Sequence, residues 1–81
     1  MTKEHRDNKR VIDSVRSLSE RRELIYRCAL DEIDTRILIL RHAEFKPFDY
    51  IADTVGLSMS AVRRHYRRAV EILSDVIRSG Q

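Results

Sequence analysis

Apolar residues recur at the spacing of helical turns along almost the whole of this 81-residue chain. Residues at positions i, i+3, i+4 and i+7 share one face of a helix, so this spacing predicts a series of amphipathic helices. Only two glycines and one proline interrupt the pattern, which favours short turns between the helices. The predicted helices span about residues 4–18, 20–30, 32–43, 47–55 and 59–78.

Polar residues, proline and glycine mark the ends of these helices. Asp31 is a predicted N-cap, because its carboxylate can accept a hydrogen bond from a free N–H group of the first turn. Pro47 suits the first position of a helix, Gly56 suits the turn after its end, and Ser58 suits the next N-cap. The other predicted end signals are Ser17 or Ser19 before the second helix, and Glu32 and Asp34 in the first turn of the third.

The third predicted helix is the most apolar of the series. We therefore expect it to be the most buried element of the fold. Its apolar residues are Ile33, Ile37, Leu38, Ile39 and Leu40.

The stretch FDYIADTVGLSMSAVRRHYRRA combines the features of a helix-turn-helix unit. Ala52 is small where two helices would cross closely, and Gly56 can adopt the positive φ that often ends a helix. Ser58 would cap the second helix, and Val62 would turn that helix toward the core. The order of these residues predicts an all-α fold, a small helical bundle that contains a helix-turn-helix and carries an extra N-terminal helix.

Arginines dominate the outward side of the final predicted helix. At about 100° per residue, Tyr66 falls with Val62 and Leu73 on the inward side. No acidic residue occurs between Met59 and Val70, whereas a solvated face usually mixes acids with bases. We therefore expect contact with nucleic acid, and an ordinary solvated face is the alternative. The outward side carries Ser60, Arg64, Arg67 and Glu71, flanked by Arg63 and Arg68.

The chemistry of arginine assigns roles to these residues. The second helix of a helix-turn-helix enters the major groove with its N-terminal half against the base edges. A guanidinium group matches guanine O6 and N7, or two phosphate oxygens. The predicted base-reading residues are Ser60, Arg64 and Arg67, with Arg63 and Arg68 on phosphates or neighbouring bases. Ser58, Lys46, Tyr50 and the helix N-terminus after Pro47 complete the predicted DNA-binding set, the last three on the DNA backbone.

Charge is distributed unevenly along the chain, whose net charge is +3. Residues 1–30 carry eight Lys and Arg against five Asp and Glu, which gives +3. Residues 31–58 carry three against six, which gives −3, and residues 59–81 carry five against two, which gives +3. Basic ends around an acidic middle predict two different kinds of surface.

Composition and residue spacing argue against several classes of protein. No apolar stretch approaches the roughly 18 residues of a membrane span, and the N-terminus lacks an apolar signal core, so we expect a cytoplasmic protein without membrane contact. Cys28 is the single cysteine and cannot form an internal disulfide. The three histidines have no metal-ligand spacing, and no phosphate-binding glycine loop is present. We therefore expect no enzyme activity, no metal and no cofactor.

Short motifs in a fixed order connect this chain to a known family. They are Ala29-Leu30-Asp31, Ile37 to His42, Ile51-Ala52-Asp53, Val55-Gly56-Leu57-Ser58, Val62, Arg68-Ala69 and Leu73. Over about residues 21–75 the chain resembles region 4 of bacterial RNA polymerase sigma factors, especially the extracytoplasmic-function class. In that family the final helix binds the −35 promoter element, and the earlier helices dock on the β-flap of RNA polymerase. The resemblance implies promoter DNA for the four arginines and polymerase for the acidic, apolar middle segment.

The chain also departs from the family pattern. Phe45-Lys46-Pro47 stands where the family usually has Gly, a hydrophobic residue and Ser, and Asp31 replaces the usual proline. Region 2 is not present, so nothing in the sequence would bind or melt a −10 element. We expect a free-standing region-4-like protein, and a fragment of a split or truncated sigma factor is the alternative.

These observations lead to one functional expectation and one alternative. We expect a sequence-specific DNA-binding transcription regulator whose final helix enters the major groove of double-stranded DNA, with RNA polymerase as a further partner. The alternative is an interaction module that binds RNA polymerase or a sigma factor without reading bases. Residues 1–20 would form a basic amphipathic helix for dimerisation or partner contact, and residues 21–81 the DNA-binding domain. Val11, Ile12, Val15, Leu18, Ile72 and Val76 would either form a homodimer seam or complete the core of a monomer.

Overall fold

The computed structural model describes residues 3–80, with side chains from Arg6 onward, and over this range it holds five α-helices and no strand. The all-α class predicted from the sequence is therefore confirmed. The helices are α1 (Lys3–Asp13), α2 (Leu18–Arg27), α3 (Glu32–His42), α4 (Phe48–Val55) and α5 (Met59–Ser79). None of these helices is long and apolar enough to cross a lipid bilayer.

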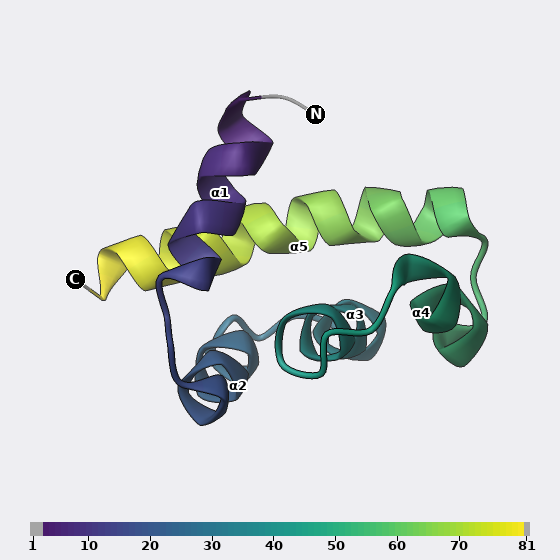
Figure 1. Ribbon diagram of the computed structural model, residues 1–81, viewed down its shortest axis with the longest axis horizontal. Coiled ribbons are helices and arrows are strands. Elements are labelled where there is room, and N and C mark those ends of the chain that lie inside the picture. Colours follow the sequence, from purple (N-terminus) through teal and green to yellow (C-terminus); the bar gives the residue numbers. More distant parts are fainter. Residues whose placement is uncertain (1–2, 81) are drawn as a thin grey trace.

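The long helix α5 is the element around which the other helices are arranged. In Figure 1, α2, α3 and α4 lie in a row beneath α5, while α1 crosses its C-terminal half. Each of these four helices packs against α5, and α3 also packs against both α2 and α4. The molecule measures 35 × 27 × 20 Å.

One face of α5 supplies much of the core. The exposed fraction of Tyr66 is 4%, so the predicted inward position of this residue is confirmed. The core also takes in Ile12 of α1 and Val15, which follows this helix. These two residues therefore complete the core, as one of the two alternatives predicted. Leu18 is exposed, and the other three residues of the predicted seam, Val11, Ile72 and Val76, are half-buried. The residues of α5 in the core are Val62, Tyr66, Ala69, Val70, Leu73 and Ile77.

Burial of α3 follows one side of its apolar run. Ile37 and Leu38 are fully buried, but Ile33 is exposed. A helix turns only one face toward its neighbours, and the apolar residues of α3 continue around its circumference. Two polar residues, Asp34 and His42, are buried on this helix instead. Only three of the eleven residues of α3 are exposed, a smaller share than in α2, α4 or α5, which agrees with the expectation that it is the most buried helix.

Local capping signals were predicted well. The side chains of Ser17, Asp31 and Ser58 accept hydrogen bonds from the backbone N–H groups three residues later, at 2.8 to 3.2 Å. Pro47 is the N-cap of α4 rather than its first residue, which corrects the prediction by one position. The first helix ends at Asp13 rather than near residue 18, and the hydroxyl of Ser14 donates a hydrogen bond back to the backbone at this end.

A buried arginine joins the ends of two helices. Arg21 on α2 is 9% exposed, and its Nε donates to the carbonyl of Val15 at 2.6 Å. Its Nη1 donates to the carbonyl of His42 at 2.9 Å, and its Nη2 reaches the carbonyl of Asp13 at 3.4 Å. The last carbonyls of a helix lack partners within the helix, and here one guanidinium group provides donors at the ends of both α1 and α3.

Replacing this arginine should destabilise the fold strongly. Arg21→Met keeps an apolar stem but leaves buried carbonyl groups without donors, so we expect the free energy of unfolding to fall by about 2–4 kcal/mol. Arg22→Met is the matched control, because Arg22 forms only a long surface ion pair with Glu44, at 3.9 Å. The Arg22→Met substitution should lower the free energy of unfolding by less than about 1 kcal/mol. Urea denaturation measures both values, and equal losses would contradict the role of Arg21.

Candidate nucleic-acid interface

A tight turn between α4 and α5 sets the position of the candidate site. Gly56 has φ 74° and ψ 32°, in the left-handed region that glycine adopts most easily. The N–H groups of Gly56 and Leu57 both donate to the carbonyl of Ala52, at 2.9 and 3.1 Å. Ser58 then caps α5. After this turn the N-terminal half of α5 packs against α4 on one side and faces solvent on the other.

The arginines predicted to bind DNA lie on this outer side. All four are exposed, while Val62 and Tyr66 on the same helix are buried. Together with Glu71, the arginines line a shallow depression on the surface. Burial of the apolar side therefore fixes the direction in which the cationic side points. The four residues are Arg63, Arg64, Arg67 and Arg68.

A buried carboxylate from α3 holds one of these arginines. Asp34 is 2% exposed, and its Oδ1 lies 2.7 Å from Nδ1 of His65. Its Oδ2 accepts a hydrogen bond from Nη2 of Arg68 at 3.3 Å, although the Arg68 side chain is 64% exposed. The prediction of an acid-free arginine face holds along the sequence but not in space, because α3 brings an acid to its edge.

The other arginines remain available to a ligand. Among the described residues, no carboxylate lies within ion-pair distance of Arg63, Arg64 or Arg67. Ser60 is exposed beside them, and its hydroxyl lies 3.4 Å from that of Ser58. Glu71 follows Arg67 by one turn and is also exposed. The cationic surface thus runs from the start of α5 as far as this glutamate.

Lys46 and Tyr50, predicted to contact the DNA backbone, lie together at the start of α4. The Nζ of Lys46 is 5.1 Å from the centre of the Tyr50 ring, within the range of a cation–π interaction. Two exposed acids of the same helix, Asp49 and Asp53, lie close by and line a shallow crevice with Tyr50. This part of the surface is therefore of mixed charge, unlike the outer side of α5.

A hydrogen bond behind the arginine face ties α5 to α3. The Tyr66 hydroxyl lies 2.8 Å from Nε2 of His42, and the two rings are stacked with their centres 5.6 Å apart. Phe48 meets the Tyr66 ring edge-on at 5.0 Å. Burial raises the pKa of Tyr66 to about 12, although the nearby Arg41 acts in the opposite direction. This pairing could not be predicted from local sequence patterns, because its partners are 24 residues apart.

Over the part of the chain that the structure describes, no three His, Cys, Asp or Glu side chains gather closely enough to hold a metal ion. Cys28 is half-buried at the edge of the core, and burial raises the pKa of its thiol. A raised pKa disfavours the reactive thiolate.

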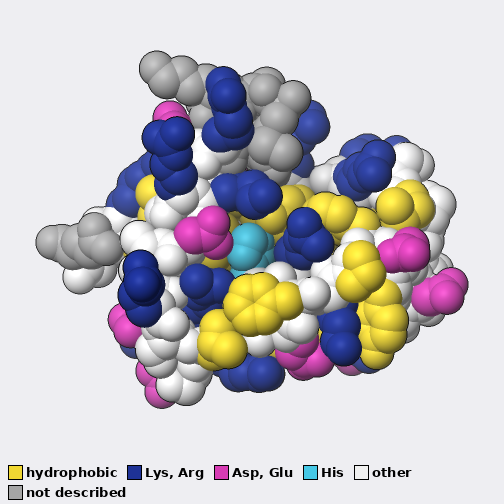
Figure 2. Space-filling model, in the orientation of Figure 1, with side chains coloured by type: hydrophobic (Ala, Val, Ile, Leu, Met, Phe, Trp, Pro, Cys, Tyr) yellow, Lys and Arg dark blue, Asp and Glu magenta, His cyan; other side chains and the backbone are white. Residues whose placement is uncertain are grey.

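Figure 2 shows Lys and Arg side chains gathered over α1 and over the start of α5. Comparison of the chain with protein-family models, with curated proteins and with solved structures found no match. The geometry and charge of this surface are therefore the observations that bear on function.

The buried tyrosine predicts how stability depends on pH. The pKa of Tyr66 is near 10 in an unfolded chain and about 12 in the folded protein, so the folded state holds this proton more tightly. The stability that protonated Tyr66 contributes is fully present below pH 10. It is lost as the pH rises to 12, which lowers the free energy of unfolding by about 2–3 kcal/mol. Chemical denaturation at several pH values between 9 and 12 measures this loss.

Two variants test the assignment of this loss to Tyr66. Tyr66→Phe should remove most of the decline between pH 10 and 12, because the titrating group is gone. Tyr26→Phe is the matched control, since Tyr26 is 63% exposed, and it should keep the parental decline. A Tyr66→Phe variant with the parental pH dependence would show that another group is responsible.

Proposed function

We propose that this protein is a sequence-specific DNA-binding transcription regulator that places the N-terminal half of α5 in the major groove of double-stranded DNA. One observation carries the proposal. Three exposed arginines without carboxylate partners among the described residues stand on the side of α5 that faces away from the core, Arg63, Arg64 and Arg67. A cluster of free guanidinium groups on an exposed helix matches the donors that bases and phosphates accept from.

In this proposal α4, the turn and α5 act as a helix-turn-helix. The left-handed Gly56 and the cap at Ser58 support it, because they fix the angle between the two helices. Arg64 and Arg67 are three residues apart, or about 4.5 Å along the helix axis. Base pairs follow one another at about 3.4 Å. Two guanidinium groups at this separation can therefore read neighbouring base pairs, while Ser60 lies one turn earlier.

The flanking arginines would bind the DNA backbone. Arg63 stands beside the base-reading residues at the edge of the exposed side. Arg68 shares one nitrogen with Asp34, and a guanidinium group has further N–H donors that can reach a phosphate. Asp34 would then hold Arg68 in one orientation. A cytoplasmic location, where DNA is accessible in bacteria, fits this activity.

Replacing base-reading arginines should weaken and broaden DNA recognition. In selection from a random-sequence library the parent should enrich one motif, and Arg64→Ala and Arg67→Ala should each cost about 1–3 kcal/mol on that motif. Specificity should relax at the contacted base pair. Arg36→Ala on α3 is the matched control, because Arg36 is exposed on another helix. If all three variants bind the selected DNA as tightly as the parent, the assignment of α5 to the groove is wrong.

A second candidate is an interaction module for RNA polymerase or a sigma factor. It is favoured by an aromatic side chain on the surface, since Phe45 is 63% exposed and has φ 58°, an unusual backbone conformation for its residue type. Phe45 lies in the acidic middle segment of net charge −3, residues 31–58. Exposed aromatic residues are enriched in protein interfaces. The two functions use different surfaces and are compatible.

Capture by RNA polymerase separates the two candidates. Phe45→Asn removes the aromatic ring, and Asn tolerates the left-handed backbone of this position. In the interaction hypothesis this variant should lose most of the captured polymerase, while Arg64→Ala and Arg67→Ala keep it. Capture by the parent and by Phe45→Asn to the same extent would exclude Phe45 as the docking residue.

A further inference from the structure

We propose that α1 forms a second wall of the DNA-binding surface and contacts phosphates of the strand that borders the groove holding α5. This inference rests on the proposed function and adds a part of the surface that the helix-turn-helix does not include. It gives the N-terminal helix a ligand of defined chemistry, the sugar-phosphate backbone next to the recognised bases.

The placement of α1 is the first observation. In Figure 1, α1 crosses α5 and continues beyond it on the side away from α2, α3 and α4. The outward side of α5 points in the same direction, because its apolar side packs against those three helices. The exposed side of α5 and the flank of α1 therefore form two walls of a corner.

Polar and apolar contacts hold α1 in this position. The Ser74 hydroxyl on α5 is buried and donates to Oδ1 of Asn8 at 2.9 Å. Nη1 of Arg78 reaches the same Asn8 oxygen at 3.4 Å. Ile12, one turn further along α1, is fully buried in the core. These contacts fix the angle between α1 and α5.

The spacing along α5 places α1 close to the arginines. Ser74 follows Arg67 by seven residues, which is about two helical turns, so both lie on one stripe of α5 about 10 Å apart. The major groove is about 12 Å wide. When the N-terminal half of α5 lies in the groove, the DNA strand that borders the groove therefore reaches α5 near the point where α1 crosses this helix.

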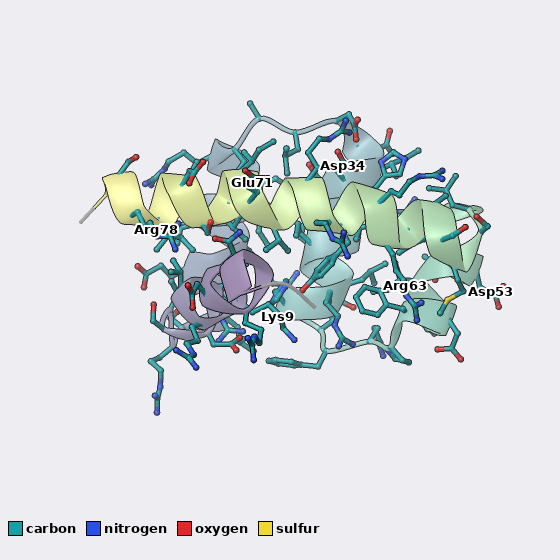
Figure 3. All side chains as sticks on the ribbon, turned by 90° about the horizontal axis from the view of Figure 1, so that it is seen from above. Lys9, Asp34, Asp53, Arg63, Glu71 and Arg78 are labelled. Atoms are coloured by element: carbon teal, nitrogen blue, oxygen red, sulfur yellow. The ribbon has the colours of Figure 1, made fainter. Side chains whose placement is uncertain are left out.

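The charge of α1 suits this strand. The described basic residues of α1 are the exposed Arg6 and Arg10 and the half-buried Lys9, and no ion pair holds any of these three among the residues that the structure describes. With Asp7 and Asp13, the described side chains of α1 sum to three positive and two negative charges, a net charge of +1. Figure 3 shows Lys9 and Arg63 on the same side of α5, opposite Asp34. Phosphates beside Arg63 would thus face Lys9 and its neighbours.

Salt dependence tests the contact. The full chain is titrated with its selected DNA and with a scrambled duplex at several salt concentrations. Each phosphate contact contributes about −0.9 to the slope of log K against log salt. The triple variant Arg6→Gln, Lys9→Gln and Arg10→Gln should lower the magnitude of the slope by about 2–3 and weaken both duplexes at least tenfold at low salt. The enriched motif should stay the same, because backbone contacts carry no sequence information.

A charge-matched triple variant is the control. Arg16→Gln, Arg27→Gln and Arg36→Gln remove the same charge from exposed positions outside the proposed corner, and should change the slope by less than about one contact. Phosphate ethylation interference adds a positional readout. Interference at the phosphates flanking the motif should disappear in the α1 variant alone.

The outcomes separate this inference from the proposed function. If the parent enriches a motif but the two triple variants lose the same slope and keep the same interference pattern, α1 does not contact the backbone and only this inference fails. If the parent enriches no motif and binds no duplex, the proposed function fails and the inference fails with it. Circular dichroism of both variants establishes that each compared protein is folded.

Discussion

The packing of one face of α5 against the other four helices is the constraint on which the rest of the structure depends. Tyr66, Val70 and Leu73 are buried on that face, and burial of a side chain of this size contributes about 1.5–3 kcal/mol. A rotation of α5 about its axis would expose these residues and press guanidinium groups into the core. The direction of Arg64 and Arg67 is therefore decided by hydrophobic burial on the opposite side of the helix, and their own charges play little part in it.

Features that depend on neighbouring residues could be predicted from the sequence, and features that depend on distant contacts could not. The caps at Ser17 and Asp31 involve a residue and its neighbour three positions later, so the sequence alone contains the information. Arg21 is different, because its acceptors are the carbonyls of residues 6, 8 and 21 positions away. The exposed Arg27 of α2 shows no local pattern that would tell the two arginines apart. The exposure of Ile33 on α3 could not be predicted for a similar reason, since periodicity counts apolar residues but does not choose among several possible inward faces.

The candidate site shows the same division most clearly at Asp34. From the sequence, Asp34 is interpreted as a favourable negative charge in the first turn of a helix. No neighbouring residue indicates a contact between Asp34 and α5. In the fold the Asp34 carboxylate is buried and contacts His65 and Arg68, which are 31 and 34 residues away. A buried carboxylate is costly unless it is hydrogen-bonded and matched by positive charge. Asp34 thus requires these partners on α5. Among the side chains that the structure describes, Arg68 is therefore engaged by a carboxylate, unlike the other three arginines of this face.

In the proposed function, the exposed length of α5 limits what this helix can recognise alone. Because α1 occupies the stripe of the helix from Ser74 onward, the open part runs from Met59 to about Glu71, roughly 18 Å at 1.5 Å per residue. That length spans about five base pairs. Each mismatched base pair weakens binding by about 1–3 kcal/mol. A site of this length therefore distinguishes its target from other sequences only modestly. Affinity from backbone contacts or from a protein partner would have to supplement it, and both the flank of α1 and the surface around Phe45 lie outside the open part of α5, where such contacts do not compete with base reading.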